Sequence, residues 1–154
     1  MKKFLLVLGF ILVIILGVLT YFRIYYTKSF SPEDQVKFED GDLKIMVVYN
    51  RPSKKGRVIF GELVPYDKVW RTGANEATTF ETNKDITFGD KTLKAGKYSL
   101  WTKPGEKTWT VLFNSESGQW GVGFNGEANR DPAKDILSIE APSVFIEKEF
   151  EQFT

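Results

Sequence analysis

The first part of the chain is apolar without interruption. Residues 4–22 read FLLVLGFILVIILGVLTYF and carry no charge, with Thr20 as the only plainly polar side chain. As an α-helix, a segment of this length extends about 28 Å, which matches a hydrocarbon core of roughly 30 Å. Aromatic side chains typical of the headgroup layer end and follow this segment: Tyr21, Phe22, Tyr25 and Tyr26. The pattern therefore predicts a helix that contacts the lipid bilayer through residues 4–22.

A cleaved signal peptide is the alternative interpretation of this segment. Its apolar region is shorter and ends in small residues at alternate positions, whereas large residues follow the apolar run here. We therefore predict that residues 1–28 form an uncleaved single-pass anchor with basic flanks. Lys2, Lys3 and the amino terminus narrowly outnumber Arg23 and Lys28, which predicts a cytoplasmic N-terminus. The rest of the chain is then expected on the extracytoplasmic (periplasmic) side of the cell membrane.

After a polar stretch at residues 29–41, which predicts a short linker, the hydrophobic period becomes two. Apolar and polar residues alternate in short segments that are separated by turn-forming residues, as is typical of antiparallel strands. The predicted strands are residues 43–50, 57–60, 78–82, 98–102, 108–113, 136–141 and 144–150. Residues 103–107 hold a Pro-Gly turn that predicts a hairpin, and Asp131-Pro132 predicts one capped helical turn. For residues 42–154 we expect an all-β domain, either an antiparallel β-sandwich or a small barrel.

Composition excludes several kinds of chemistry. The 154 residues include no cysteine and no histidine. A disulfide, a thiol nucleophile, a Ser-His-Asp triad and a histidine-ligated zinc are therefore impossible. All 20 acidic residues follow residue 32, so the part beyond the helix has more acidic than basic residues despite a formal net charge of +1. Such a domain binds polyanions poorly, so we expect no nucleic acid partner. We also expect no metal and no cofactor.

Two segments are not explained as ordinary strand or turn, residues 49–57 and residues 69–78. The second contains Trp70, Arg71, Asn75 and Glu76 around a Gly-Ala pair. A guanidinium fork, an amide, a carboxylate and an aromatic face are the groups that a small-ligand pocket requires. The alternative is structural, with Arg71 and Glu76 paired to each other and Asn75 bonded to loop backbone.

Aromatic and acidic residues give two weaker candidates. The aromatic residues form either the core or a platform for sugar stacking: Trp101, Trp109, Phe113, Trp120 and Phe124. Glycoside hydrolysis requires two carboxylates held close together, and no such pair is recognisable in the sequence. Glu76 is the only acid within an unusual segment, so a hydrolase is the least supported reading.

Four ordered motifs resemble a bacterial family known as DUF2911: Tyr49-Asn-Arg-Pro-Ser, Gly61-Glu-Leu-Val-Pro-Tyr66, Val69-Trp-Arg-Thr-Gly-Ala-Asn-Glu-Ala-Thr78 and Ala95-Gly-Lys-Tyr-Ser-Leu100. The resemblance extends from about Asp42 to Thr154. It implies a β-rich, envelope-associated domain whose signature residues lie in the two unusual segments. Some members carry an asparagine-synthetase label, but this chain has neither an N-terminal cysteine nor a nucleotide-binding loop. Family members usually continue with further strands, so the resemblance implies a possible fragment with an open sheet edge at the C-terminal end.

Together these features predict a membrane-tethered module that binds a small polar ligand or an envelope glycan. The expected ligand-binding residues are Tyr49, Arg51, Trp70, Arg71, Asn75 and Glu76. The alternative is an accessory subunit that docks on a membrane protein complex through its sheet edge and its helix. We expect binding rather than catalysis, and assign no catalytic residue.

Overall fold

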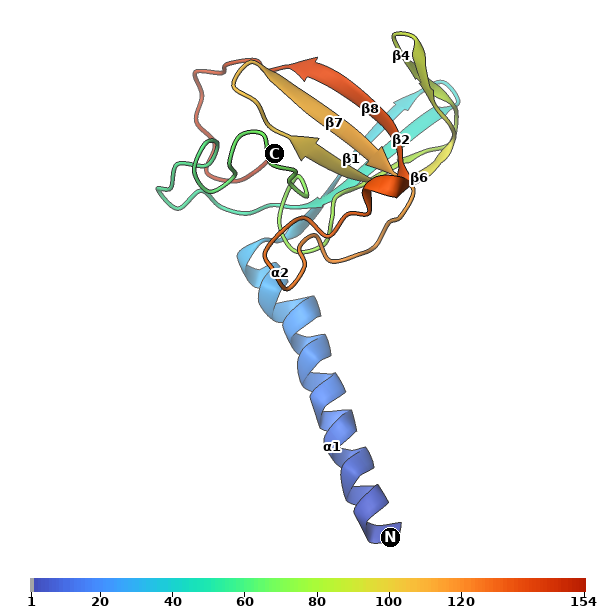
Figure 1. Ribbon diagram of the computed structural model, residues 1–154, viewed down its shortest axis with the longest axis vertical. Helices are drawn as coiled ribbons and strands as arrows, with labels where there is room; N and C mark the ends of the chain where they lie inside the picture. The colour runs from blue at the N-terminus through green and yellow to red at the C-terminus, as the bar shows by residue number, and fades with distance from the viewer. Residues whose placement is uncertain (1) are drawn as a thin grey trace.

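The computed structural model describes residues 2–154 and begins with one continuous helix that projects away from the rest of the molecule (Figure 1). It consists of α1 (Lys2–Tyr21), a π-helical turn η1 (Phe22–Tyr26) and α2 (Thr27–Phe30). Rings four residues apart meet edge to face along it, with centroids 5.0 Å apart for Phe22 and Tyr26, and 5.1 Å for Tyr26 and Phe30. The helix ends before Pro32, because a residue that precedes proline avoids the helical conformation. Among residues 2–154 it is the one helix long and apolar enough to cross a membrane or to act as a signal anchor.

The predicted linker is a strand. Residues Glu33–Asp40 form β1, which pairs along its whole length with β2 (Leu43–Asn50) through a turn at Gly41, whose φ is 56°. All of its side chains are exposed except that of Asp34, which is half-buried. Because the strand buries almost no side chain, its sequence is not required to alternate apolar and polar residues. The prediction of a linker at residues 29–41 was therefore wrong, because an edge strand is held by backbone hydrogen bonds that any side chain permits.

The remaining strands complete one six-stranded antiparallel sheet, in the order β1-β2-β3-β6-β7-β8. Their bounds are β3 (Thr79–Thr82), β6 (Gly96–Lys103), β7 (Thr108–Asn114) and β8 (Asp135–Pro142). A small second sheet, the hairpin of β4 (Ile86–Phe88) and β5 (Lys91–Leu93), packs on one face. The domain is thus β-rich as predicted. The described residues form no closed barrel, and the second sheet has only two strands.

The core lies on the sheet face that the β4–β5 hairpin covers. Its buried side chains come from the central strands and from the hairpin: Phe80, Leu93, Tyr98, Phe113 and Leu137. The rings of Phe80 and Phe113 meet edge to face at 5.2 Å, and Phe88 stacks on Phe113 at 5.9 Å. Period-two alternation placed these residues on one face, which is why the sequence predicted most of the strands.

Two predicted strands were wrong. Residues 57–60 lie in turns, and Phe60 makes only an isolated bridge with Val64. Residues 144–150 form no ladder, since β8 ends at Pro142, which has no N–H to donate. The predicted hairpin across residues 103–107 is confirmed by the pairing of β6 and β7. The capped turn is confirmed as η2 (Pro132–Lys134), in which the Asp131 side chain accepts from the Ala133 N–H.

Candidate functional site

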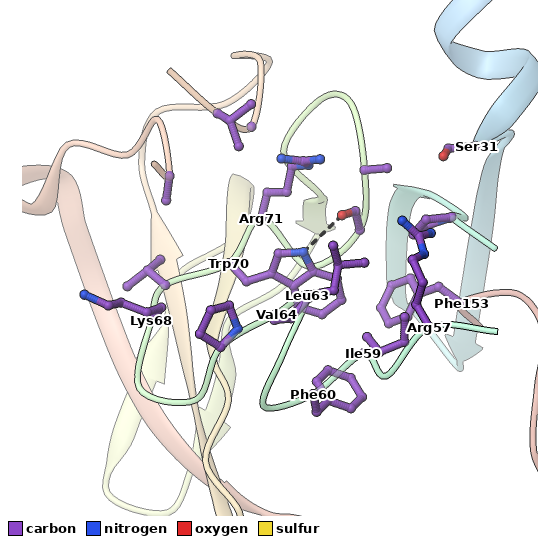
Figure 2. A pocket seen from close by; sticks show the side chains of 18 of the residues that line it. Ser31, Arg57, Ile59, Phe60, Leu63, Val64, Lys68, Trp70, Arg71 and Phe153 are labelled. Atoms are coloured by element: carbon purple, nitrogen blue, oxygen red, sulfur yellow. Dashed lines mark hydrogen bonds between the residues drawn. The ribbon is translucent and has the colours of Figure 1, made fainter. Parts of the chain in front are cut away.

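A cavity of about 960 Å³ lies among irregular segments at one end of the sheet (Figure 2). It is lined by parts of residues 52–74, by residues on both sides of Gly126, and by the C-terminal tail at residues 150–153. The tail is fastened to the domain by backbone hydrogen bonds, in which Lys54 N donates to Glu151 O and Phe153 N donates to Pro52 O. With Ser31, which also lines it, the site is therefore assembled from four parts of the chain that are far apart in the sequence, and none of them is a strand.

Aromatic rings form one wall of this cavity. The Trp70 ring lies edge to face against Phe60 at 6.1 Å and against Phe153 at 5.3 Å. Its Nε1 donates to the Gly73 carbonyl oxygen at 3.1 Å, which fixes the plane of the ring. In the view of Figure 2, Trp70 lies between Phe60 and Arg71. Trp70 and Arg71 are the two predicted ligand-binding residues that line the cavity.

Arg71 is the most unusual polar group of the site. Its Nε is buried without a hydrogen-bond partner, and none of the ion pairs among residues 2–154 involves it. Burial removes water from the guanidinium and lowers the pKa of Arg71 from its ordinary value. Gly121 packs against its stem so closely that a Cβ there would lie 2.7 Å from the Arg71 Cβ. A half-buried guanidinium whose Nε has no acceptor is unfavourable to folding, so this arrangement is typical of a binding site rather than of structural support.

The predicted pairing of Arg71 with Glu76 does not occur. Glu76 instead accepts a hydrogen bond from Asn50 Nδ2 at 3.3 Å, and its other oxygen lies 3.6 Å from Arg23 Nε. Asn75 Nδ2 donates to the Ser31 carbonyl oxygen at 3.3 Å. Asn75 and Glu76 thus join the end of the helix to the domain, and neither lines the cavity.

Tyr49 and Arg51 hold the C-terminal tail. The Tyr49 ring meets Phe153 edge to face at 5.6 Å, and Arg51 Nε donates to the Phe153 carbonyl oxygen at 3.0 Å. Arg51 also donates to Asp34 Oδ2 at 3.0 Å, which ties β1 to the same corner. Neither side chain lines the cavity. Both hold the C-terminal tail, which forms one of its walls.

Several basic side chains around the cavity were missed by sequence reasoning. They line the cavity together with two acids, Glu127 and Glu151: Lys54, Arg57, Lys68 and Arg130. Lys54 and Arg57 lie in the segment at residues 49–57 that the sequence analysis singled out, whereas Lys68 and Arg130 lie outside both of its unusual segments. With Arg71 they give the cavity a net positive charge.

The loop that presents Trp70 and Arg71 has a strained backbone. Thr72, a β-branched residue, has a φ of 56°, and Asn75 has a φ of 57°. A non-glycine residue in this region costs on the order of 1–3 kcal/mol. The loop is held by the hydroxyl contact of Thr72 with Thr102 at 3.0 Å, and by the Thr78 hydroxyl, which donates to the Thr72 carbonyl oxygen at 2.6 Å. Strain that persists under such restraint fixes where Trp70 and Arg71 point.

The aromatic platform is not assembled. Trp101 is 0% exposed and Phe113 belongs to the core, whereas Phe124 is fully exposed in a loop. Trp109 contacts Phe60, with ring centroids 4.9 Å apart, from outside the cavity. Trp120 lies beside Arg23, whose guanidinium is 5.7 Å from its ring centre. Across residues 2–154, no three acidic side chains gather closely enough to hold a metal ion.

Because Arg71 and Glu76 do not touch, we expect a coupling energy within about 0.5 kcal/mol of zero between Arg71→Met and Glu76→Ala. Removing the unpartnered charge of Arg71 should leave the free energy of unfolding unchanged or raise it. Urea unfolding of the wild type, both single variants and the double variant measures these values. A matched cycle on Arg51 and Asp34, which do form a hydrogen-bonded ion pair at 3.0 Å, should give a coupling of up to about 1 kcal/mol. A larger coupling energy for Arg71 and Glu76 than for this control pair would contradict the finding that Arg71 and Glu76 do not touch.

Comparison with known proteins adds one finding to this geometry. A search of curated proteins and of solved structures gave no match to this chain. A family model described as "Protein of unknown function (DUF2911)" matches residues 31–154. The match covers both segments that were singled out in the sequence, and also β1, which lies before the predicted domain start at residue 42. The chain therefore belongs to the DUF2911 family.

Proposed function

We propose that this protein is a membrane-tethered module whose domain lies on the extracytoplasmic side and binds a small polar ligand or an envelope glycan. The ligand occupies the cavity lined by Trp70 and Arg71. The observation that carries this proposal is the buried Nε of Arg71, which has no partner among residues 2–154. A polar group left in this state is unfavourable by about 1–3 kcal/mol, and a ligand that accepts its hydrogen bond recovers that energy.

Binding is supported by the shape of the site as well. Ligand pockets are typically concavities of about 300–1,000 Å³ with mainly apolar walls and a few placed polar groups. The cavity of about 960 Å³ falls within this range, and its wall carries Phe60, Trp70 and Phe153. The Trp70 ring is oriented before a ligand arrives, because its Nε1 is already bonded to Gly73. Such preorganisation reduces the entropy lost on binding.

We expect a true ligand to stabilise the full-length protein in detergent by about 2.7 kcal/mol at about 100 times its Kd. For a domain of this size the melting temperature rises by roughly 5–10 °C. A thermal-melt screen of envelope sugars, muropeptides and amino acids measures this rise. Trp70→Leu should reduce it, whereas Trp109→Leu should not.

Trp109→Leu is the matched control, because both tryptophans contact Phe60 and only Trp70 lines the cavity. Equal loss of ligand stabilisation in the two variants would place the ligand elsewhere. If no compound in the screen raises the melting temperature, the proposed binding function fails.

Docking on a membrane protein complex is the second candidate. The observation that favours it is a contiguous apolar segment after β8, in which Val144 is 79% exposed, Phe145 is 92% exposed and Ile146 is 58% exposed. Among the described strands, none pairs with the outer edge of β8, and unpaired edges accept strands from other chains. The same screen separates the two candidates, since docking through this edge requires no ligand in the cavity.

A further inference from the structure

The cavity combines two properties, an apolar wall and a charged lining that is mainly cationic. Its apolar wall includes Ile59, Phe60, Leu63, Val64 and Trp70. Its polar lining is mainly cationic, with five Lys or Arg side chains against two Glu. An apolar wall requires an apolar group in the ligand, and an excess of positive charge requires an anion. A neutral sugar can pack against the apolar wall but supplies no negative charge.

Most of the cationic groups are already satisfied within the protein. Lys54 forms an ion pair with Glu149, and Arg130 forms one with Asp135. Arg57 donates through Nε to the Lys54 carbonyl oxygen and through Nη2 to that of Ser53. Arg71 differs from these three, because no acceptor in residues 2–154 meets its buried Nε. Arg57 and Lys68 also form no ion pair among residues 2–154, but of the five cations Arg71 alone has a buried nitrogen without an acceptor.

A guanidinium in this position has a defined recognition chemistry. It stays protonated at neutral pH even when burial lowers its pKa, and its planar fork matches the two oxygens of a carboxylate or a phosphate. The stem of Arg71 is held by Gly121, where a Cβ would lie 2.7 Å from the Arg71 Cβ. The absence of a side chain at Gly121 thus gives the stem of Arg71 the space that it occupies in the lining of the cavity.

We propose that the cavity takes an organic anion, in which a carboxylate or phosphate joined to an apolar group places its charge on Arg71 and its apolar body against Trp70 and Phe60. This inference rests on the binding function proposed above and names the chemical class of the ligand. A neutral ligand leaves the Arg71 charge uncompensated, and a cationic ligand is repelled by the lining.

Two sources supply this chemistry, a soluble organic acid and an anionic lipid. Ser31, the residue directly after the helix, also lines the cavity. The cavity therefore reaches the end of the anchor, where a lipid headgroup would lie. Soluble compounds test the first source, and nanodiscs that contain an anionic lipid test the second.

The test uses the full-length protein in nanodiscs of phosphatidylcholine, with binding measured by titration calorimetry. Phenylacetate supplies an anion on an apolar ring, phenylacetamide is its neutral counterpart, and inorganic phosphate is an anion without an apolar body. We expect phenylacetate to bind roughly tenfold to hundredfold more tightly than phenylacetamide, the value of a charge-assisted hydrogen bond. Phosphate should bind more weakly than phenylacetate, because it gains nothing from the apolar wall.

Arg71→Met should remove this difference, so that phenylacetate binds no more tightly than phenylacetamide. Cooperative urea unfolding of the variant shows that it is folded. Lys37→Met is the matched control, because Lys37 is an exposed lysine on β1 that does not line the cavity. It removes the same unit of charge and should leave the affinity for phenylacetate as it was.

Nanodiscs that contain phosphatidylglycerol separate the two sources. If the lipid fills the cavity, both phenylacetate and phenylacetamide bind more weakly there than in phosphatidylcholine alone. If the phosphatidylglycerol acts only through its surface charge, phenylacetate alone binds more weakly. This result identifies a soluble acid as the ligand class.

The anion assignment and the binding function can fail separately. Phenylacetamide that binds as tightly as phenylacetate, or a preference for the anion that survives Arg71→Met, overturns the anion assignment and leaves ligand binding intact. Failure of every compound, here and in the melting screen, overturns both proposals.

Discussion

Replacing Trp101 by alanine is expected to lower the free energy of unfolding by about 3–5 kcal/mol, as for other large buried aromatic residues. Trp101 is 0% exposed, and its Nε1 donates at 2.8 Å to the hydroxyl of Ser99, which is also fully buried. The substitution leaves a cavity and also removes one partner of Ser99, whose hydroxyl still donates to the Glu116 carbonyl oxygen at 2.6 Å. Urea unfolding of the full-length protein in detergent measures the loss.

Trp109→Ala is the control for this experiment, since Trp109 lies on the adjacent strand β7 and is only half-buried. Its loss should be clearly smaller than that of Trp101→Ala, because the hydrophobic term follows the area removed from water. The comparison decides whether Trp101 is a core residue or part of a sugar-binding surface. Similar, small losses in both variants would be inconsistent with the packing described here.

Deletion of residues 2–22 is expected to move the protein almost completely from the membrane fraction to the soluble fraction. The helix is exposed along these residues, so nothing in the described part of the chain covers its apolar side chains. About 20 apolar residues suffice to span a bilayer, and their transfer from lipid to water is strongly unfavourable. Fractionation of cells that express each form, with mass determination of the wild type, measures the effect. The wild type should retain its N-terminus at full-length mass.

Protease treatment of intact spheroplasts tests the side on which the domain lies. The domain should be digested while a cytoplasmic marker protein stays intact. Protection of the domain, or a wild-type soluble form that begins after residue 20, would contradict the proposed anchor and its orientation. Replacing residues 4–22 with a leucine-rich segment of equal length is the matched control and should keep the protein in the membrane.

The sequence by itself determined the elements whose signal is local. An uninterrupted apolar run specified the helix, because length and hydropathy need no distant partner. Alternation specified β2, β3, β6, β7 and β8, since each places its apolar side chains on the covered face of the sheet. The Asp131 cap and the turn at residues 103–107 depend only on neighbouring residues, and the structure contains both.

The sequence also identified the segment at residues 69–78, but not how its residues are used. Arg71 and Glu76 are five positions apart, a spacing that permits pairing and does not require it. The positive φ of Thr72 and of Asn75 turns the loop so that Arg71 lines the cavity while Asn75 and Glu76 meet the end of the helix. Backbone conformation of this kind has no reliable sequence signal in a threonine.

Only the tertiary structure decided the extent of the sheet and the composition of the site. β1 has almost no buried face, so its pairing with β2 left no hydrophobic pattern to read. Arg51 reaches the carbonyl oxygen of Phe153, 102 positions away in the chain, and the cationic lining extends from Lys54 to Arg130. Contacts between distant residues depend on how the whole chain closes, because each is formed only after the entropy of the intervening loops has been lost. The cavity with its unpartnered Arg71 is therefore a property of the folded domain, although each of its residues is visible in the sequence.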